Sequence, residues 1–137
     1  MNIRSLMKRR VETLPPRASA TEAARVMRDA RVGSVIVAVE ERPVGVVTDR
    51  DLVLRVLAPG LDPARVALAE VMSPRPVFVA ETAEVSYVLE LMRDLAVRRV
   101  PVVDASQTLV GVVSLDDLIL SLASDLGAVA ETIRKEM

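Results

Sequence analysis

The chain has 137 residues, a formal net charge of −1, and neither cysteine nor histidine. The length fits about one domain, and the even charge balance gives no field that would draw the protein to nucleic acid or to an anionic membrane. The missing side chains exclude disulfides, serine–histidine triads and the usual zinc sites, so we do not expect an enzyme. The N-terminus lacks the apolar core of a signal peptide and the longest apolar run, Val35 to Val39, is too short to span a bilayer, so we expect a cytoplasmic protein.

An internal repeat organises the chain. Shifting the sequence by 65 residues aligns Met27-Arg28-Asp29 with Met92-Arg93-Asp94. After one extra residue in the second half, Val44-Gly45-Val46-Val47 aligns with Val110-Gly111-Val112-Val113 at a shift of 66. Two copies are too few, and each is too long, for a solenoid, so we expect two similar units that share one core.

The first copy predicts the element order β-α-β-β-α. A short strand over Val11–Leu14 precedes a helix whose apolar residues from Ala23 to Ala30 recur with helical spacing. Two mainly apolar runs, Ser34–Val39 and Pro43–Thr48, predict an antiparallel hairpin whose sheet is covered on both faces. A helix over Asp49–Leu57 closes the unit.

The second copy predicts the same order. Its elements are a strand over Pro76–Val79, a helix around Val88–Leu95, a hairpin of Val100–Asp104 and Leu109–Ser114, and a helix from Leu115 to about Leu126. The sequence therefore predicts an α/β fold of two tandem β-α-β-β-α units, packed sheet to sheet about a pseudo-twofold axis.

The repeat also suggests where the units begin and end. We expect a first unit over residues 1–60, a linker over 61–71 and a second unit over 72–126, followed by a helical tail over 127–137 that packs on a partner or frays. A short helix is expected over Ala64 to Met72, between the units.

Both copies place a hydroxyl at the end of a strand and an aspartate three positions later, at the start of a helix. The pairs are Thr48 with Asp51 and Ser114 with Asp117. This spacing fits helix capping, in which the hydroxyl and the acid each accept a backbone N–H. It also fits a small-ligand site, because a hydroxyl, a carboxylate and a helix N-terminus, which favours anions, meet at the end of a strand. Spacing alone favours capping, and the two roles can coexist.

The order and duplication of these motifs resemble the CBS domain family over residues 2 to 125. The segments that carry the resemblance are Met72-Ser73-Pro74, the helix of Ala23 to Met27, the strand of Arg99 to Asp104, and the two signatures Gly45 to Asp51 and Gly111 to Asp117. The chain looks like one tandem CBS pair, often called a Bateman module, with no attached enzyme, channel or DNA-binding domain.

The resemblance implies a regulatory module that binds adenosine-containing ligands, such as AMP, ADP, ATP or S-adenosylmethionine, in clefts between the paired units. Carried over by position, Asp51 and Asp117 would hold ribose, and Thr48 and Ser114 would hold phosphate. The loops before the second strands would line the base. The further ligand-binding residues expected are Val32, Ser34, Ser73, Val97, Arg98, Arg99 and Pro101.

Basic residues lie near both expected cleft mouths. Lys8-Arg9-Arg10 and Arg98-Arg99 would either neutralise ligand phosphates or remain solvated surface charges. Since the first copy has Gly33-Ser34 where the second has Arg98-Arg99, we expect the two clefts to differ in preference.

The resemblance also favours a homodimer, a flat disc of four CBS units, and an unidentified effector protein that responds to the ligand. The helices after Asp51 and Asp117 would make the contact, through Val53, Val56, Leu57, Ile119, Leu122 and Leu126. The alternative is a structural dimerisation or interaction protein whose clefts are empty.

Overall fold

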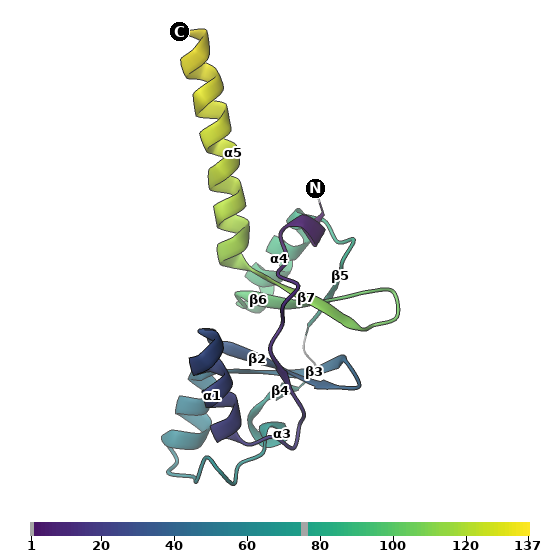
Figure 1. The fold of residues 1–137 in the computed structure, drawn as a ribbon, viewed down its shortest axis with the longest axis vertical. Coiled ribbons are helices and arrows are strands. Elements are labelled where there is room, and N and C mark those ends of the chain that lie inside the picture. Colours follow the sequence, from purple (N-terminus) through teal and green to yellow (C-terminus); the bar gives the residue numbers. More distant parts are fainter. Residues whose placement is uncertain (1, 75–76) are drawn as a thin grey trace.

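The computed structural model describes residues 2–74 and 77–137, which form two α/β units (Figure 1). The first unit has a four-stranded sheet in the order β1-β2-β3-β4, where β1 runs parallel to β2 and the other neighbours are antiparallel. Its strands are β1 (Thr13–Leu14), β2 (Ser34–Val39), β3 (Arg42–Thr48) and β4 (Ser73–Pro74). Its helical segments are α1 (Ala20–Ala30), α2 (Asp49–Leu52), the π-helical turn η2 (Val53–Leu57) and α3 (Leu68–Val71).

The second unit repeats this plan with a three-stranded sheet in the order β5-β6-β7. Its strands are β5 (Val79–Ala80), β6 (Arg99–Val103) and β7 (Leu109–Ser114), and its helices are α4 (Val85–Leu95) and α5 (Leu115–Glu136). The parallel pairing of β5 with β6 and the antiparallel hairpin of β6 with β7 match those of the first unit. The predicted α/β fold of two tandem units is therefore confirmed.

The two hairpin turns explain the one-residue change in the repeat. In the first unit Glu40 and Glu41 make a two-residue turn, and both have positive φ, as the twist of a tight hairpin requires. In the second unit the turn over residues 104–108 is longer, and Gln107 has a positive φ. The extra residue is accommodated in the turn, as the alignment of the repeats predicts.

Several expected boundaries differ from the structure. The strand expected over Val11–Leu14 begins at Thr13, and the one expected over Pro76–Val79 begins at Val79, with Pro76 outside the described residues. The linker helix expected over Ala64 to Met72 covers only Leu68–Val71, because Ala67 is extended and forms a β-bridge with Ser19.

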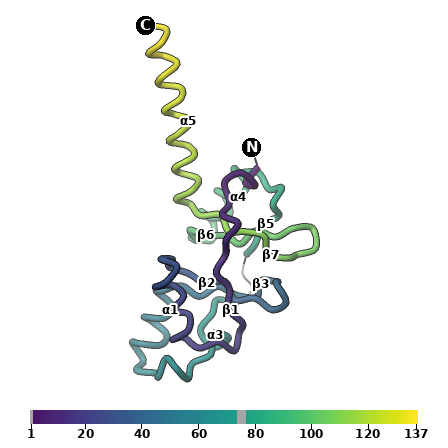
Figure 2. The backbone as a smooth tube through the Cα atoms, in the orientation of Figure 1, coloured from purple at the N-terminus to yellow at the C-terminus, as the bar shows by residue number. Residues whose placement is uncertain are grey.

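The two units exchange the segments that precede them. The 3₁₀ turn η1 (Ile3–Ser5) packs on the second unit, where the Ile3 N–H donates to Ala83 O at 3.0 Å. Leu68, which matches Ile3 in the repeat, packs on the first unit, and its N–H donates to Ala18 O at 2.8 Å. Figure 2 shows the N-terminal segment running from the second unit across to the first. Residues early in the chain therefore complete the second core.

Two hydrophobic cores result from this exchange, one in each unit. Ile3 and Met7 are buried in the second core, whereas Leu68 and Val71 are buried in the first. Met7, Met27 and Met92 are buried and Met72 packs half-buried against the first core, so these methionines belong to the cores.

The second strand of each hairpin is covered less completely than expected. β3 and β7 alternate between buried residues such as Val47 and Val113, which face the helices, and half-buried ones such as Val46 and Val112. The prediction of two covered faces is therefore only half met. The half-buried face lies toward the space between the units, where the clefts described below open.

The last helix is longer than one unit requires. α5 continues without interruption from Leu115 through the predicted tail to Glu136 and projects away from the body (Figure 1). Within the residues that the structure describes, no helix combines the length and apolar character needed to cross a membrane.

Candidate functional site

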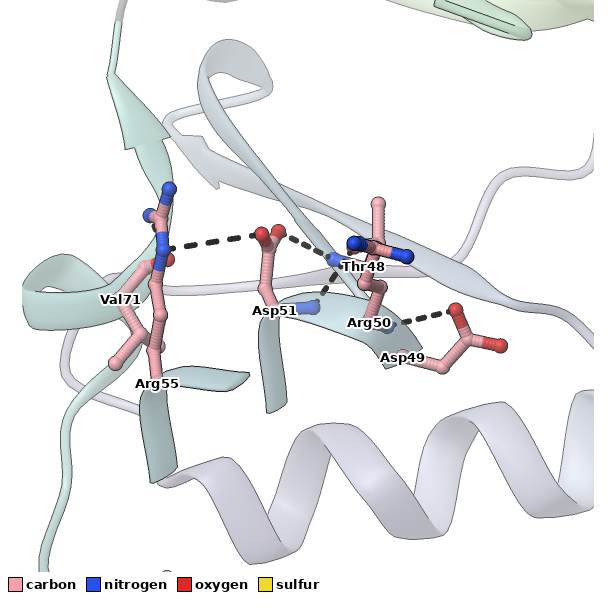
Figure 3. Close-up of polar contacts among 6 residues, drawn as sticks. All are labelled: Thr48, Asp49, Arg50, Asp51, Arg55 and Val71. Atoms are coloured by element: carbon pink, nitrogen blue, oxygen red, sulfur yellow. Dashed lines mark hydrogen bonds and ion pairs between the residues drawn. The ribbon is translucent and has the colours of Figure 1, made fainter. Parts of the chain in front are cut away.

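The Thr48 corner forms a complete capping box (Figure 3). The Thr48 N–H donates to Asp51 Oδ2 at 2.9 Å, and the Asp51 N–H donates to Thr48 Oγ1 at 3.1 Å. Arg55 lies one turn further on, with Nε 4.0 Å from Asp51 Oδ1, and its Nη1 donates to Val71 O at 2.9 Å. Both carboxylate oxygens of Asp51 therefore face groups of the protein, and the capping interpretation is confirmed for this corner.

The Ser114 corner makes only half of that box. The Asp117 N–H donates to Ser114 Oγ at 3.1 Å. Asp117 Oδ1 lies 3.9 Å from Lys8 Nζ, whereas Oδ2 is buried and has no hydrogen-bond partner among the described residues. A carboxylate oxygen accepts hydrogen bonds and is costly to bury without one. This corner therefore presents an acceptor that the protein leaves unused.

The repeat explains the difference between the two aspartates. Arg55 of the first unit aligns with Ser121 of the second, whose short side chain replaces the guanidinium that approaches Asp51. The cation near Asp117 is Lys8, on the segment that crosses from the first unit, and Ser73 takes the matching place near Asp51. The two clefts therefore inherit different charges from matched positions.

The Thr48 corner opens into a cleft of about 600 Å³ between the units, which we name cleft A. Across from Thr48 and Asp51, the second unit contributes Val97 and Pro101. The complete lining is Ser34, Val46, Thr48, Asp49, Arg50, Asp51, Ser73, Val77, Leu95, Ala96, Val97, Arg98, Arg99 and Pro101.

The Ser114 corner opens into a second cleft of about 780 Å³, which we name cleft B. Across from Ser114 and Asp117, the first unit contributes Val32 and Ile36. The complete lining is Lys8, Arg9, Arg10, Val11, Glu12, Asp29, Ala30, Arg31, Val32, Ser34, Ile36, Arg99, Val112, Ser114, Asp116, Asp117 and Leu120. Each cleft therefore joins the strand-to-helix corner of one unit to the second strand of the other.

Ser34 and Arg99, which match in the repeat, line both clefts. They stand at the first residues of β2 and β6, the strands that each unit contributes to the opposite cleft. The two clefts therefore meet at the centre of the pseudo-symmetric pair, and one residue of each unit can affect both.

Cleft B contains several cations without an acidic partner. Arg10 pairs with Glu12 at 3.6 Å, and Lys8 is the residue near Asp117. Arg9, Arg31 and Arg99 make no ion pair within the described part of the chain and remain available to an anion.

Two acids at the rim of cleft B are already paired. Asp116 accepts a hydrogen bond from Arg98 Nη2 at 2.9 Å. A hydrogen bond from Arg28 lowers the pKa of the Asp29 carboxyl, which therefore stays ionised well below neutral pH. Neither pair involves the three available arginines, so cleft B keeps its cationic side.

All eleven residues predicted from the sequence line a cleft. Thr48, Asp51, Ser73, Val97, Arg98 and Pro101 lie in cleft A, Val32, Ser114 and Asp117 in cleft B, and Ser34 and Arg99 in both. Each cleft is built from both units, as the resemblance to a CBS pair implies.

Some residues in or next to the clefts were missed. Arg55 could have been found, because it stands four residues after Asp51, a spacing at which helical side chains meet. Arg31 gave no such signal, since it adopts a left-handed conformation at the end of α1, where glycine is the usual residue. Val77 and Leu95 carry no polar group that would mark a site.

Both halves of the chain match the family model of the CBS domain, at residues 3–58 and 68–124. The chain belongs to the CBS domain family. This CBS pair is 35% identical over 120 residues to the protein MK0525 of Methanopyrus kandleri, and the match covers 87% of the chain but only 61% of that relative's length.

Solved structures share the fold of the pair. The CBS domain protein PAE2072 of Pyrobaculum aerophilum, solved in complex with AMP, is 33% identical with a TM-score of 0.79, over 90% of this chain and 99% of that one. The hexameric CBS-CP12 protein of bloom-forming cyanobacteria is 28% identical with a TM-score of 0.77, over 98% of this chain and 81% of that one. Within the described residues of our CBS pair, no group of three or more acids is placed to hold a metal ion.

Proposed function

We propose that this CBS pair is a regulatory module that binds an adenosine nucleotide, and that cleft B is its principal site. The Asp117 carboxylate carries the proposal, because it lines a cleft of about 780 Å³ and its buried Oδ2 has no hydrogen-bond partner among the described residues. Ribose hydroxyls would supply the missing donors. The AMP complex of the Pyrobaculum aerophilum protein supports this class of ligand.

The residues of cleft B suit the parts of such a ligand. The Ser114 oxygen accepts the Asp117 N–H, which leaves its hydroxyl proton free to donate to a phosphate at the start of α5. Val32 and Ile36 offer apolar surface to the adenine. The three unpaired arginines favour AMP, ADP or ATP over S-adenosylmethionine, because phosphates are anions that guanidinium groups bind well.

Cleft A is proposed to bind the same class of ligand more weakly. Asp51 already accepts the Thr48 N–H and faces Arg55, so a ribose would have to compete with both. Arg98 and Arg99 could still approach a phosphate there. Unequal occupancy of the two clefts follows from this difference.

The signal would be a change in how the two units sit. Because each cleft joins residues of both units, a ligand that prefers one arrangement shifts the population toward it. An effector protein would respond to that change, and the ligand would come from the adenosine nucleotides of the cytoplasm.

The domain limits 1–60, 61–71, 72–126 and 127–137 remain our proposal for the sequence units.

We further propose that the pair associates with a second copy, in a disc of four CBS units. The hexameric relative supports self-association in this family. Val53, Leu57, Ile119, Leu122 and Leu126 are exposed as this contact requires, whereas Val56 is buried and does not take part. A protein that dimerises with empty clefts is the second candidate, and binding rather than catalysis is common to both.

A thermal-shift series with AMP, ADP, ATP and S-adenosylmethionine tests the function. A ligand at 100 times its Kd adds about 2.7 kcal/mol to the free energy of unfolding, which is several degrees for a domain of this size. We expect the phosphate-bearing ligands to stabilise the protein most. If none of the four ligands shifts the midpoint at millimolar concentration, the module is the dimerisation protein instead.

A further inference from the structure

α5 carries an apolar stripe that its own chain does not cover. Ile119, Leu122, Leu126, Val129 and Ile133 are each between 52% and 62% exposed. Leu118 is the one buried residue of the helix, so the contact with the body ends within the first two turns. From there to Glu136 the helix projects from the body (Figure 1).

The stripe has the spacing of a coiled-coil seam. Its five residues are separated by three, four, three and four positions, which makes Ile119, Leu126 and Ile133 the a positions and Leu122 and Val129 the d positions of a heptad. Between Ile119 and Ile133 the charged residues Asp125 and Glu131 lie outside these positions, and Glu136, at the next d position, ends the seam. An uncharged a/d seam on an exposed helix is the pattern of a helix that packs against another helix.

The distal part of α5 lacks other support. Helical segments in water gain most of their stability from packing of an apolar face, and Gly127 weakens the middle of this one. Residues 131–137 are all exposed, so the last turns gain no support from packing against the described part of the body. A partner helix would bury the stripe and hold these turns.

We propose that two copies of this chain pair through α5 in a parallel, two-stranded coiled coil whose seam is Ile119, Leu122, Leu126, Val129 and Ile133. This extends the proposed contact of Ile119, Leu122 and Leu126 along α5 to Val129 and Ile133, beyond residue 124, where the match to the CBS domain ends. It is independent of ligand binding, because cleft B lies within one chain.

Side-chain chemistry favours this partner and this direction. In parallel coiled coils a β-branched residue at a with leucine at d favours two strands, and Ile119, Leu122 and Ile133 follow this pattern whereas Leu126 and Val129 do not. In a parallel pair Asp125, at position g, faces Ala130 of the second copy, whereas antiparallel pairing would bring the two Asp125 carboxylates together. Both bodies then lie at the same end of the helices, as side-by-side assembly of the CBS units requires.

The available area is sufficient for an interface. Five half-exposed apolar side chains on each of two helices amount to roughly 1,000 Å² of buried surface, the lower limit for a specific interface. The seam is shorter than the about three to four heptads of an independent coiled coil. Contacts between the bodies would therefore contribute to the dimer.

Aspartate substitutions on α5 test whether the seam holds two copies together. Val129→Asp places a charge at the seam beyond the disc contact, and Ala128→Asp places the same charge at an exposed position off the seam. By light scattering, we expect Val129→Asp to raise the dimer dissociation constant at least tenfold and Ala128→Asp to leave it within a factor of two. A monomeric wild-type protein, or equal effects of both substitutions, would overturn the proposal.

Disulfide trapping tests the direction, because the chain has no cysteine of its own. In a parallel pair Val129→Cys faces its own copy and forms a disulfide under mild oxidation, whereas Ala128→Cys points outward and does not. In an antiparallel pair Val129 would face Ile119, so Val129→Cys would fail to cross-link and contradict the proposal. An AMP thermal shift measured on the same variants separates this result from a failure of ligand binding.

Discussion

Asp51 and Asp117 hold the same place in the repeat, but their carboxylates face different partners. The three-residue spacing from hydroxyl to acid predicts both caps, and both aspartate N–H groups are capped as predicted. The spacing could not predict the state of the carboxylates, because this depends on Arg55 in one unit and on Lys8, from the other unit, in the second. The local spacing therefore determines that each aspartate N–H is capped, whereas contacts with residues elsewhere in the chain determine which groups face each carboxylate.

Asparagine substitutions separate these two states. Asp51→Asn should lower the free energy of unfolding by about 1 kcal/mol, since it removes a charge that favours the helix start and faces Arg55. Asp117→Asn should lower the free energy of unfolding by less. It also removes a favourable charge at the start of α5, but this loss is offset because the buried Oδ2, which has no partner among the described residues, no longer carries charge. Urea unfolding of the two variants measures the difference, and equal losses would contradict it.

Gly111 lets the crossing segment lie against β7. An added Cβ there would stand 2.7 Å from Lys8 O and 3.0 Å from Met7 Sδ, and the backbone oxygen cannot move without breaking the bridge to Val112. Gly111→Ala should therefore cost about 1–3 kcal/mol. Gly127→Ala, in open space on α5, should instead stabilise by up to about 1 kcal/mol. Thermal midpoints of both variants check the prediction, which fails if Gly111→Ala is harmless.

At the scale of elements, the hairpins follow from the sequence and the exchanged segments do not. Apolar runs separated by short turns predict β2–β3 and β6–β7 nearly to the residue. Sequence order assigns residues 1–10 to the first unit, but Ile3 and Met7 lie in the second core. These contacts involve single residues and short bridges, such as that of Lys8 with Val112, which leave no periodic pattern to read.

Ile3 tests the exchange, because residues so near a terminus usually tolerate change. Ile3 is fully buried, so Ile3→Ala should lower the free energy of unfolding by about 2–5 kcal/mol. Leu61→Ala, at a half-exposed position, serves as the control and should cost far less. Denaturant unfolding measures both variants, and a loss at Ile3 no larger than that at Leu61 would show that the N-terminal segment is not part of the core.

At the scale of the whole molecule, both clefts depend on the packing of one unit against the other. Each signature residue could be named from the sequence, but its neighbours across the cleft come from the opposite unit, about 50 to 85 residues away in the chain. The position of Arg31 at the rim of cleft B likewise follows from how α1 ends and from the placement of the units. A single chain thus gains two clefts of different charge from one repeated motif.

Calorimetric titration of AMP into matched variants tests the central claim, that cleft B is the principal nucleotide site. Hydrogen bonds to a charged group contribute about 1.5–3 kcal/mol, so Asp117→Ala should weaken AMP binding by roughly tenfold or more. Asp51→Ala is the same change in cleft A. It should leave the dissociation constant of the stronger AMP-binding step within about threefold of the wild-type value. Loss of that step in Asp51→Ala, with Asp117→Ala binding like the wild type, would contradict the account.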